Sequence, residues 1–342
     1  MSMVDVTVRG AGIFGLTVAW EALNRGARVC VIDPNGVGNG ASGGVVGALQ
    51  PHTPDPWNEK KQFQLESLLM ARTFWPKVET VSGLATGYAQ VGRVMPLAND
   101  RDVELAQSRV TAAMKNWGDA AVWKVLDALD QTQTGWSTSS PTGYYVHDTL
   151  SAILHPTQAV AALAKGIQAK GGEIVTDGQN NGAVIWATGW QGLIDMGAGN
   201  GVKGQAAVFE HDASGAAQLY ADGLHLIPHR NGTVAVGSTS EKEFDRPDTT
   251  DDLLEETIAK ARALVPAMAD APVLERWAGV RPRAKSRAPL LGPWPGRGGH
   301  FVANGGFKIG FGMAPKCAEV LVDLVLNGTD AIPEAFRTAP NS

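Results

Sequence analysis

The sequence predicts an α/β protein with two parts: a parallel sheet with flanking helices, and an antiparallel sheet combined with helices. Three observations support this prediction. Near the N-terminus, an apolar run leads through a glycine-rich turn into a helix-favouring segment and a second apolar run. Within 202–240, apolar and polar residues alternate around an Asn-Gly turn, as in antiparallel sheets. After residue 300, an apolar run, a glycine-rich turn and a helix follow again.

The first glycine-rich turn has the spacing of a dinucleotide site. Gly10, Gly12 and Gly15 follow an apolar run and open a helix, and Asp33 ends the next apolar run, 18 residues after Gly15. Glycines let the backbone approach a pyrophosphate, and the helix N-terminus offers free N–H groups and a positive dipole end. The acid can accept hydrogen bonds from a ribose. The pattern predicts a Rossmann-like domain.

Arg9 departs from this pattern, because it stands before the first glycine, where an apolar residue is usual. Two interpretations stay open. Either the end of the first strand is partly open, or Arg9 faces a phosphate.

A second glycine-rich tract covers residues 35–51. It contains Val45, Val46 and Leu49, which a flexible glycine-serine linker would lack. Glycines allow backbone to pack closely against a flat or charged group. A bound cofactor would explain the tract.

Length and composition favour an ordinary soluble protein. The 342 residues suggest two domains, and 44% of them are hydrophobic and 18% charged. No apolar run is long enough for a membrane span, and the N-terminus has no features of a secretory signal. The net charge of -5 gives no general attraction to nucleic acid or to anionic membranes. Cys30 and Cys317 are expected as buried apolar residues rather than a disulfide, which favours a cytoplasmic location.

The rest of the chain gives helix and strand signals. Asn231 and Gly232 predict a hairpin turn, since both tolerate positive φ. Trp117, Trp123 and Trp136 are expected in a core or domain interface rather than in an aromatic substrate box. Helices are expected at 59–78, 99–130, 157–170, 251–264 and 314–326, and strands near 88–95, 173–176, 183–189, 224–227, 233–236 and 300–303.

Five stretches together resemble the FAD-dependent amino-acid oxidase family, also called the D-amino-acid oxidase superfamily. The resemblance covers nearly the whole chain and is closest to the glycine oxidase branch, which is associated with thiamine biosynthesis. It implies an FAD domain formed by 1–52, 145–204 and 277–342, and a substrate domain formed by 53–144 and 205–276. In the family's order, the stretches are 10–15, Ala41-Ser42-Gly43-Gly44, Ala187-Thr188-Gly189, Trp277-Ala278-Gly279-Val280-Arg281-Pro282 and Gly305-Gly306-Phe307-Lys308.

The resemblance implies FAD as cofactor, with Asp33 on the adenosine ribose, and no metal site. FAD is expected to be noncovalent, because 283–287 lacks the cysteine that attaches flavin in sarcosine oxidases. The implied cofactor-binding residues are Gly10, Gly12, Ile13, Phe14, Gly15, Asp33, Pro34, Ala41, Ser42, Gly43, Gly44, Gly47, Ala48, Leu49, Ala187, Thr188, Gly189, Gly305, Gly306, Phe307, Lys308, Ile309 and Gly310.

The resemblance also implies the chemistry, in which hydride passes from the α-carbon of an amino acid to flavin and the imine product hydrolyses to a keto acid. Arg281 matches the family's carboxylate-binding arginine, and its planar guanidinium suits a two-point contact. Lys308 matches a basic residue that several members place beside the same carboxylate. The alternatives are a structural ion pair for Arg281 and a solvated loop position for Lys308.

Two histidines are further catalytic candidates. His225 stands where glycine oxidases tend to have a tyrosine, and a histidine there would change substrate size and the response to pH. His52 directly follows the second glycine-rich tract and is a candidate to face the active site. A structural role is the alternative for His52.

The expected function is oxidation of glycine or another small amino acid or amine that carries a carboxylate, with oxygen as acceptor and hydrogen peroxide as product. A quinone acceptor and a homo-oligomeric assembly stay open. A second hypothesis is an oxidase of a carboxymethylaminomethyl group in tRNA, although the acidic net charge argues against nucleic acid. A third is a non-catalytic FAD-binding protein. The tRNA hypothesis rests on the Gly47-Ala48-Leu49 and Pro51 pattern, which such an oxidase shares, and the basic cluster Arg281, Arg283, Lys285 and Arg287 is compatible with it.

Overall fold

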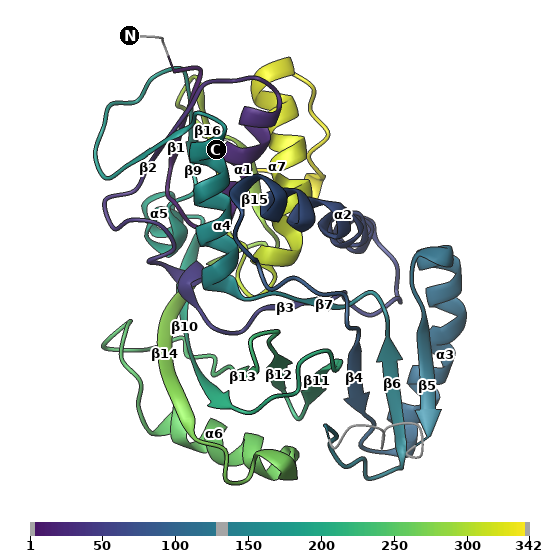
Figure 1. Ribbon diagram of the computed structural model, residues 1–342. Coiled ribbons are helices and arrows are strands. Elements are labelled where there is room, and N and C mark those ends of the chain that lie inside the picture. The colour runs from purple at the N-terminus through teal and green to yellow at the C-terminus, as the bar shows by residue number, and fades with distance from the viewer. Residues whose placement is uncertain (1–3, 128–135, 339–342) are drawn as a thin grey trace.

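The computed structural model describes residues 4–127 and 136–338, which contain two large sheets (Figure 1). Neighbouring strands of the first sheet are parallel, except for one antiparallel pair at its edge. The predicted parallel sheet is confirmed. In spatial order its strands are β15 (Leu290–Pro293), β16 (His300–Asn304), β9 (Ala183–Trp186), β1 (Val6–Arg9), β2 (Val29–Ile32) and β8 (Glu173–Val175).

Helices pack around the first sheet and bury its apolar strands. Val6 and Val8 of β1 are fully buried, in a core that also holds Leu16 and Leu321 from two helices. Burial on both faces explains why these strands appear in the sequence as continuous apolar runs. The surrounding helices are α1 (Ile13–Asn24), α2 (Glu59–Ser82), α4 (Pro156–Ala169), α5 (Gly189–Asp195) and α7 (Gly310–Asn327).

The second sheet is antiparallel except for one parallel pair between its fifth and sixth strands. Gly232, with φ of 80°, lies in the hairpin turn that the sequence predicts. The strands, in spatial order, are β14 (Val273–Ala284), β10 (Gly199–Glu210), β13 (Thr233–Gly237), β12 (Leu224–Pro228), β11 (Gln218–Ala221), β4 (Arg93–Pro96), β6 (Tyr144–Asp148) and β5 (Trp123–Asp127).

Smaller elements complete the described chain. In Figure 1, α6 (Asp252–Leu264) lies beneath β10 and the hairpin, and α3 (Asp100–Trp117) lies beside β5. A two-stranded sheet joins β3 (Ala48–Leu49) to β7 (Ala152–Ile153), so the second glycine-rich tract is tied to the interior. Short 3-10 helices occur at η1 (Ala41–Gly43), η2 (Gly118–Ala120), η4 (Pro266–Met268) and η5 (Glu334–Phe336).

The two faces of β12 have different surroundings. Leu224 and Leu226 lie in a core shared with α6. Because side chains alternate along a strand, His225 and Ile227 lie on the other face. There Ile227 packs with Val45 of the second glycine-rich tract. The sheet therefore presents His225 on the side of that tract.

The structure corrects one predicted helix. The helix expected over 99–130 ends at Trp117, because Gly118 adopts a φ of 55° that ends the helix. The chain then forms β5, which pairs with β6. Residues 128–130 of the prediction lie outside the described residues. Trp117, Trp123 and Trp136 are all buried, which confirms their expected packing role.

The expected division into domains stays a prediction. Its boundaries at 204/205 and 276/277 fall inside β10 and β14, which pair with each other along their lengths. In the described part of the chain, no helix has the length and apolar character needed to cross a membrane. Cys317 is buried in α7, Cys30 is half-buried in β2, and both thiols are free.

Candidate active site

Three of the predicted stretches meet at one edge of the first sheet. β1, β9 and β16 are parallel neighbours, so the turns that follow them lie side by side. A Cβ on Gly10 would lie 2.3 Å from the carbonyl oxygen of Ala187, and one on Gly306 would lie 3.1 Å from the ring of Phe14. The carboxyl ends of parallel strands are the usual ligand-binding edge of such sheets.

Gly10 and Gly15 of the first glycine-rich turn leave no room for a side chain. Gly10 has a φ of 110°, and a Cβ on Gly15 would lie 1.9 Å from the carbonyl oxygen of Gly10. The stretch around Ser42 packs on this turn, because the Ile13 N–H donates to Ser42 Oγ at 2.9 Å. Two stretches far apart in sequence therefore surround the N-terminus of α1.

Asp33 lies beside the same turn, at the end of β2. Its Oδ2 accepts from the Ala11 N–H at 2.7 Å, and its Oδ1 accepts from the Asn35 N–H at 2.9 Å. Each carboxylate oxygen keeps a further lone pair, so a ribose hydroxyl fits as an additional donor.

Arg9 is anchored on the loop 177–182. Its Nε donates to Asn180 Oδ1 at 2.7 Å, and its Nη2 donates to the Gly178 carbonyl at 2.7 Å. The guanidinium is thus occupied by this polar loop.

The second glycine-rich tract is packed backbone rather than a linker. A Cβ on Gly47 would lie 1.8 Å from the carbonyl oxygen of Leu154, and one on Gly44 would lie 3.3 Å from the ring of Trp277. Val45 is buried, and its carbonyl accepts from His229 Nε2 at 3.0 Å.

Arg281 is a buried cation on β14. Its Nη1 donates to Ser238 Oγ and its Nη2 to the Thr239 carbonyl, both at 2.8 Å. Its Nε is buried without a hydrogen-bond partner among the described residues. Burial lowers the pKa of Arg281 to about 10, opposed by the nearby charge of Glu241. A buried cation of this kind favours an anionic ligand.

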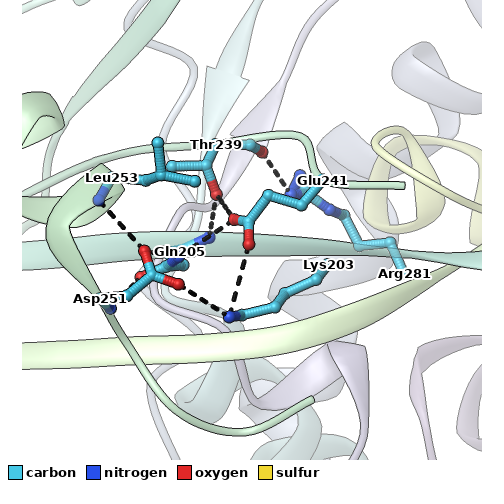
Figure 2. A network of polar contacts seen from close by, with 7 residues as sticks. All are labelled: Lys203, Gln205, Thr239, Glu241, Asp251, Leu253 and Arg281. Carbon is cyan, nitrogen blue, oxygen red and sulfur yellow. Dashed lines mark hydrogen bonds and ion pairs between the residues drawn. The ribbon is translucent and has the colours of Figure 1, made fainter. Parts of the chain in front are cut away.

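Figure 2 shows how a neighbouring network fixes the loop that Arg281 contacts. Lys203 Nζ lies 3.4 Å from Glu241 Oε2 and 3.3 Å from Asp251 Oδ2. Gln205 donates to the same two carboxylates. Lys203 is therefore neutralised by two acids, and the Thr239 hydroxyl, which donates to Glu241, links the network to Arg281.

Lys308 and Arg281 lie around the ring of Phe307. Lys308 Nζ is 5.9 Å from the ring centroid, and Arg281 Cζ is also 5.9 Å from it. Burial lowers the pKa of Lys308, and the charge of Arg281 lowers it further. Phe307 itself has a φ of 43°, an uncommon conformation that often marks functional sites.

His225 shares the electrostatic environment of these two cations. Burial lowers its pKa to about 3, and the charges of Arg93, Lys308 and Arg281 contribute in that order. Its ring lies 4.6 Å from that of Tyr220, and its Nε2 lies 3.4 Å from Gln50 Nε2. The structure thus brings three of the four catalytic candidates together.

His52 borders a cavity beside the C-terminal glycine-rich loop. Its Nδ1 lies 2.5 Å from Gln64 Oε1, which also accepts from the His52 N–H at 2.7 Å. Burial is the main cause that lowers the His52 pKa. The cavity has a volume of about 190 Å³ and a basic lining: His52, Lys60, Arg283, Ala284, Arg287, Ala288, Gly305, Gly306, Phe307, Lys308 and Ile309. A wider groove of about 530 Å³, lined by residues that include Trp20 and Lys170, lies elsewhere along α1, α2 and α4.

The basic cluster that the tRNA hypothesis would use does not form one surface. Arg281 is only 8% exposed, whereas Lys285 and Arg287 are exposed. Arg281 therefore faces the interior of the protein.

Comparison with known proteins assigns the family. Residues 5–324 match the DAO family, described as FAD dependent oxidoreductase. The chain belongs to this family. It is 26% identical over 390 residues to glycine oxidase from Pseudomonas aeruginosa, covering 98% of each chain. Glycine oxidase from Pseudomonas putida is 27% identical over 363 residues, again covering 98% of each chain. The crystal structure of glycine oxidase from Geobacillus kaustophilus has the same fold, with a TM-score of 0.85 at 19% identity over 100% of both chains.

The geometry of this DAO-family enzyme fits FAD, the cofactor of its family. Glycines at 10, 15 and 47 occupy places where a Cβ would collide with backbone. The N-termini of α1 and α7, which pack together, both follow glycine-rich turns at the same sheet edge. Helix N-termini favour the negative charge of a pyrophosphate or a reduced flavin. The roles of the individual residues stay predictions.

Sequence reasoning missed three polar residues beside His225. Arg93 and Asp148 are register partners on β4 and β6 and form a buried ion pair of 2.8 Å. Arg93 Nη1 also donates to Gln50 Oε1 at 2.6 Å. A charged residue within each short strand was the available signal, but only the register shows that the two charges meet.

Proposed function

We propose that this DAO-family enzyme oxidises glycine or another small amino acid or amine that carries a carboxylate. The observation that carries the proposal is the buried guanidinium of Arg281, whose hydrogen bonds among the described residues go to a hydroxyl and a carbonyl rather than to an acid. A buried charge that lacks a counter-ion is costly, and a substrate carboxylate would supply the counter-ion for Arg281. Relatives named glycine oxidase support the same substrate class.

Arg281 and Lys308 would hold the carboxylate and so fix the position of the α-carbon. FAD, when bound, supplies the two-electron acceptor that takes the hydride. The chain contributes mainly binding and orientation. The two cations also favour the neutral form of the substrate amine, because nearby positive charge disfavours an ammonium ion. That form is required, since the nitrogen lone pair must assist the loss of hydride.

We propose that FAD is held noncovalently by the glycine-rich turns. Cys317 is buried in the apolar core and Cys30 lies in the interior strand β2. Acid precipitation should therefore release the flavin into the supernatant. Flavin that stays in the pellet would contradict this part of the proposal.

Oxygen as acceptor, hydrogen peroxide as product and a place in thiamine biosynthesis extend the proposal along the glycine oxidase branch. A cytoplasmic location and a homo-oligomeric assembly remain predictions of the same kind. Peroxide formation measured against reduction of a quinone dye distinguishes the two acceptors.

The deciding experiment is an anaerobic screen for bleaching of the flavin absorbance. Glycine, sarcosine, alanine and proline are suitable first substrates, because each has one carboxylate and one amine. We expect at least one of them to bleach the flavin. If no small amino acid or secondary amine does so, the proposed function fails.

A further inference from the structure

A line of polar contacts connects a buried acid to His225. Asp148, which is fully buried, accepts from Arg93 Nε at 2.8 Å. Arg93 Nη1 donates to Gln50 Oε1 at 2.6 Å, and Gln50 Nε2 lies 3.4 Å from His225 Nε2. The line runs from the second sheet, through the end of the second glycine-rich tract, to the candidate active site.

The chemistry of these groups determines which atom donates and which accepts in each contact. A guanidinium has no acceptor, so the Gln50 atom that faces Arg93 must be the amide oxygen. The Gln50 NH₂ group then faces His225, and an amide nitrogen only donates. His225 Nε2 must therefore accept, which leaves the ring hydrogen on Nδ1.

The Nδ1 atom of His225 is buried and has no hydrogen-bond partner among the described residues. A buried donor without an acceptor is costly, so we expect a bound ligand to supply the acceptor for this N–H. His225 is the register partner of Gly237, where a Cβ would lie 3.0 Å from Val46 Cγ2. The ring thus lies on the face of the sheet that packs against Val46, where the charge of Arg281 also acts on it.

We propose that Asp148, Arg93 and Gln50 hold His225 as its Nδ1–H tautomer, and that this N–H donates a hydrogen bond to a carboxylate oxygen of the substrate beside Arg281. The second half of this statement rests on the proposed function. The first half rests only on the contacts among the four side chains.

The charges that face His225 agree with a neutral ring. Arg93 from β4, Arg281 from β14 and Lys308 from the loop before α7 are all cations, and they oppose a second proton on the imidazole. Tyr220 from β11 and Gln50 supply its uncharged neighbours. The ring would therefore stay neutral well below the ordinary histidine pKa of 6.5.

The tautomer can be measured without any substrate. In the FAD-loaded protein labelled with ¹⁵N in its histidine rings, long-range ¹H–¹⁵N spectra report which nitrogen carries the hydrogen, and His225→Phe assigns the signal. We expect the hydrogen on Nδ1 in the unmodified protein, and a mixture of both tautomers in Gln50→Leu. Gln62→Leu is the matched control, because the exposed Gln62 donates one amide hydrogen bond to Glu66 on the surface of α2. A hydrogen on Nε2, or on both nitrogens, near neutral pH overturns the tautomer assignment.

The ligand contact is tested with glycolate, which has the carboxylate of glycine but no amine. Binding is followed by the flavin spectrum and by the His225 Nδ1–H resonance. His225→Phe should raise the glycolate Kd about 10- to 100-fold, and His225→Tyr should restore much of the affinity through its hydroxyl donor. An unchanged Kd in His225→Phe, or an unmoved resonance in the unmodified protein at saturating glycolate, overturns the contact.

The two failures remain distinguishable. If no amino acid bleaches the flavin, the proposed function fails while the tautomer measurement still decides whether Gln50 holds the Nδ1–H tautomer of His225. If bleaching succeeds and the hydrogen lies on Nε2, the tautomer assignment of His225 fails and the proposed function stands.

Discussion

The guanidinium of Arg281 lies over the backbone of Gly204, on the neighbouring strand. A Cβ on Gly204 would lie 1.4 Å from Arg281 Nη2, so this glycine provides the space in which the guanidinium reaches Ser238 and Thr239. The position of the proposed substrate clamp therefore depends on a residue that carries no functional group.

Gly204→Ala should separate substrate binding from stability. The colliding atoms belong to the far end of a flexible side chain, so the guanidinium can move aside while the backbone stays in place. It would then lose its contacts, and we expect KM to rise about 10-fold or more, as for loss of a charged hydrogen bond. Steady-state kinetics and thermal unfolding measure the two effects. Gly298→Ala, where a Cβ would meet nothing within 4 Å, is the control, and equal KM values for both variants would refute this role.

Replacing Arg281 should weaken substrate binding while FAD stays bound. Loss of a charge-assisted two-point contact costs about 2 to 4 kcal/mol, so Arg281→Ala should raise KM at least about 30-fold. Arg281→Lys keeps the charge but not the planar donor pair, so its KM should lie between those of the unmodified protein and of Arg281→Ala. Kinetics and the ratio of flavin to protein absorbance provide the measurement. Unchanged turnover at low substrate would contradict the assignment.

Gly10→Ala should impair FAD binding. Gly10 combines a φ of 110° with a Cβ position 2.3 Å from the Ala187 carbonyl, so either the turn or β9 must shift. We expect most of the bound flavin to be lost and the melting temperature to fall. Gly26→Ala is the matched control, because Gly26 also has a positive φ, of 83°, but its Cβ would meet nothing within 4 Å. Similar flavin content in both variants would show that the glycine turn is not the cofactor site.

Acidification should destabilise the protein through His229. Its ring is buried 4.5 Å from that of His155, and burial, followed by the charge of His155, lowers its pKa from 6.5 to about 4. Well above pH 6.5 the histidine is neutral in both states and contributes nothing. As the pH falls from 6.5 towards 4, the unfolded chain gains a proton that the folded protein excludes, so the free energy of unfolding decreases.

His229→Gln should make that decrease shallower by up to about 1.4 kcal/mol per pH unit. The glutamine amide can still donate to the Val45 carbonyl, so the fold should be retained. Urea unfolding near pH 7, 6 and 5 measures the slope. An identical slope in the variant would mean that His229 takes up a proton in the folded state as readily as in the unfolded chain.

The features predicted correctly are those whose physics is local in the sequence. The strand-turn-helix at Gly10, Gly12 and Gly15 and the hairpin at Asn231 depend on spacing and on positive φ, which a short stretch of chain reveals. The predicted roles of Arg281 and Lys308 depended on resemblance to a family, because neither residue is unusual in its local sequence. The prediction of a helix over 99–130 was wrong beyond Trp117, because a single glycine, Gly118, ends the helix.

The sequence by itself determined that the chain has glycine-rich strand-to-helix junctions of the kind that suit a dinucleotide. The carboxylate-binding role of Arg281 stays a prediction from the family resemblance. Only the tertiary structure decided how these segments meet. Sheet order places the turns after β1, β9 and β16 side by side, and strand register brings Arg93 to Asp148. The contact between Gln50 and His225 spans 175 positions, and such pairings depend on long-range packing that no local pattern encodes.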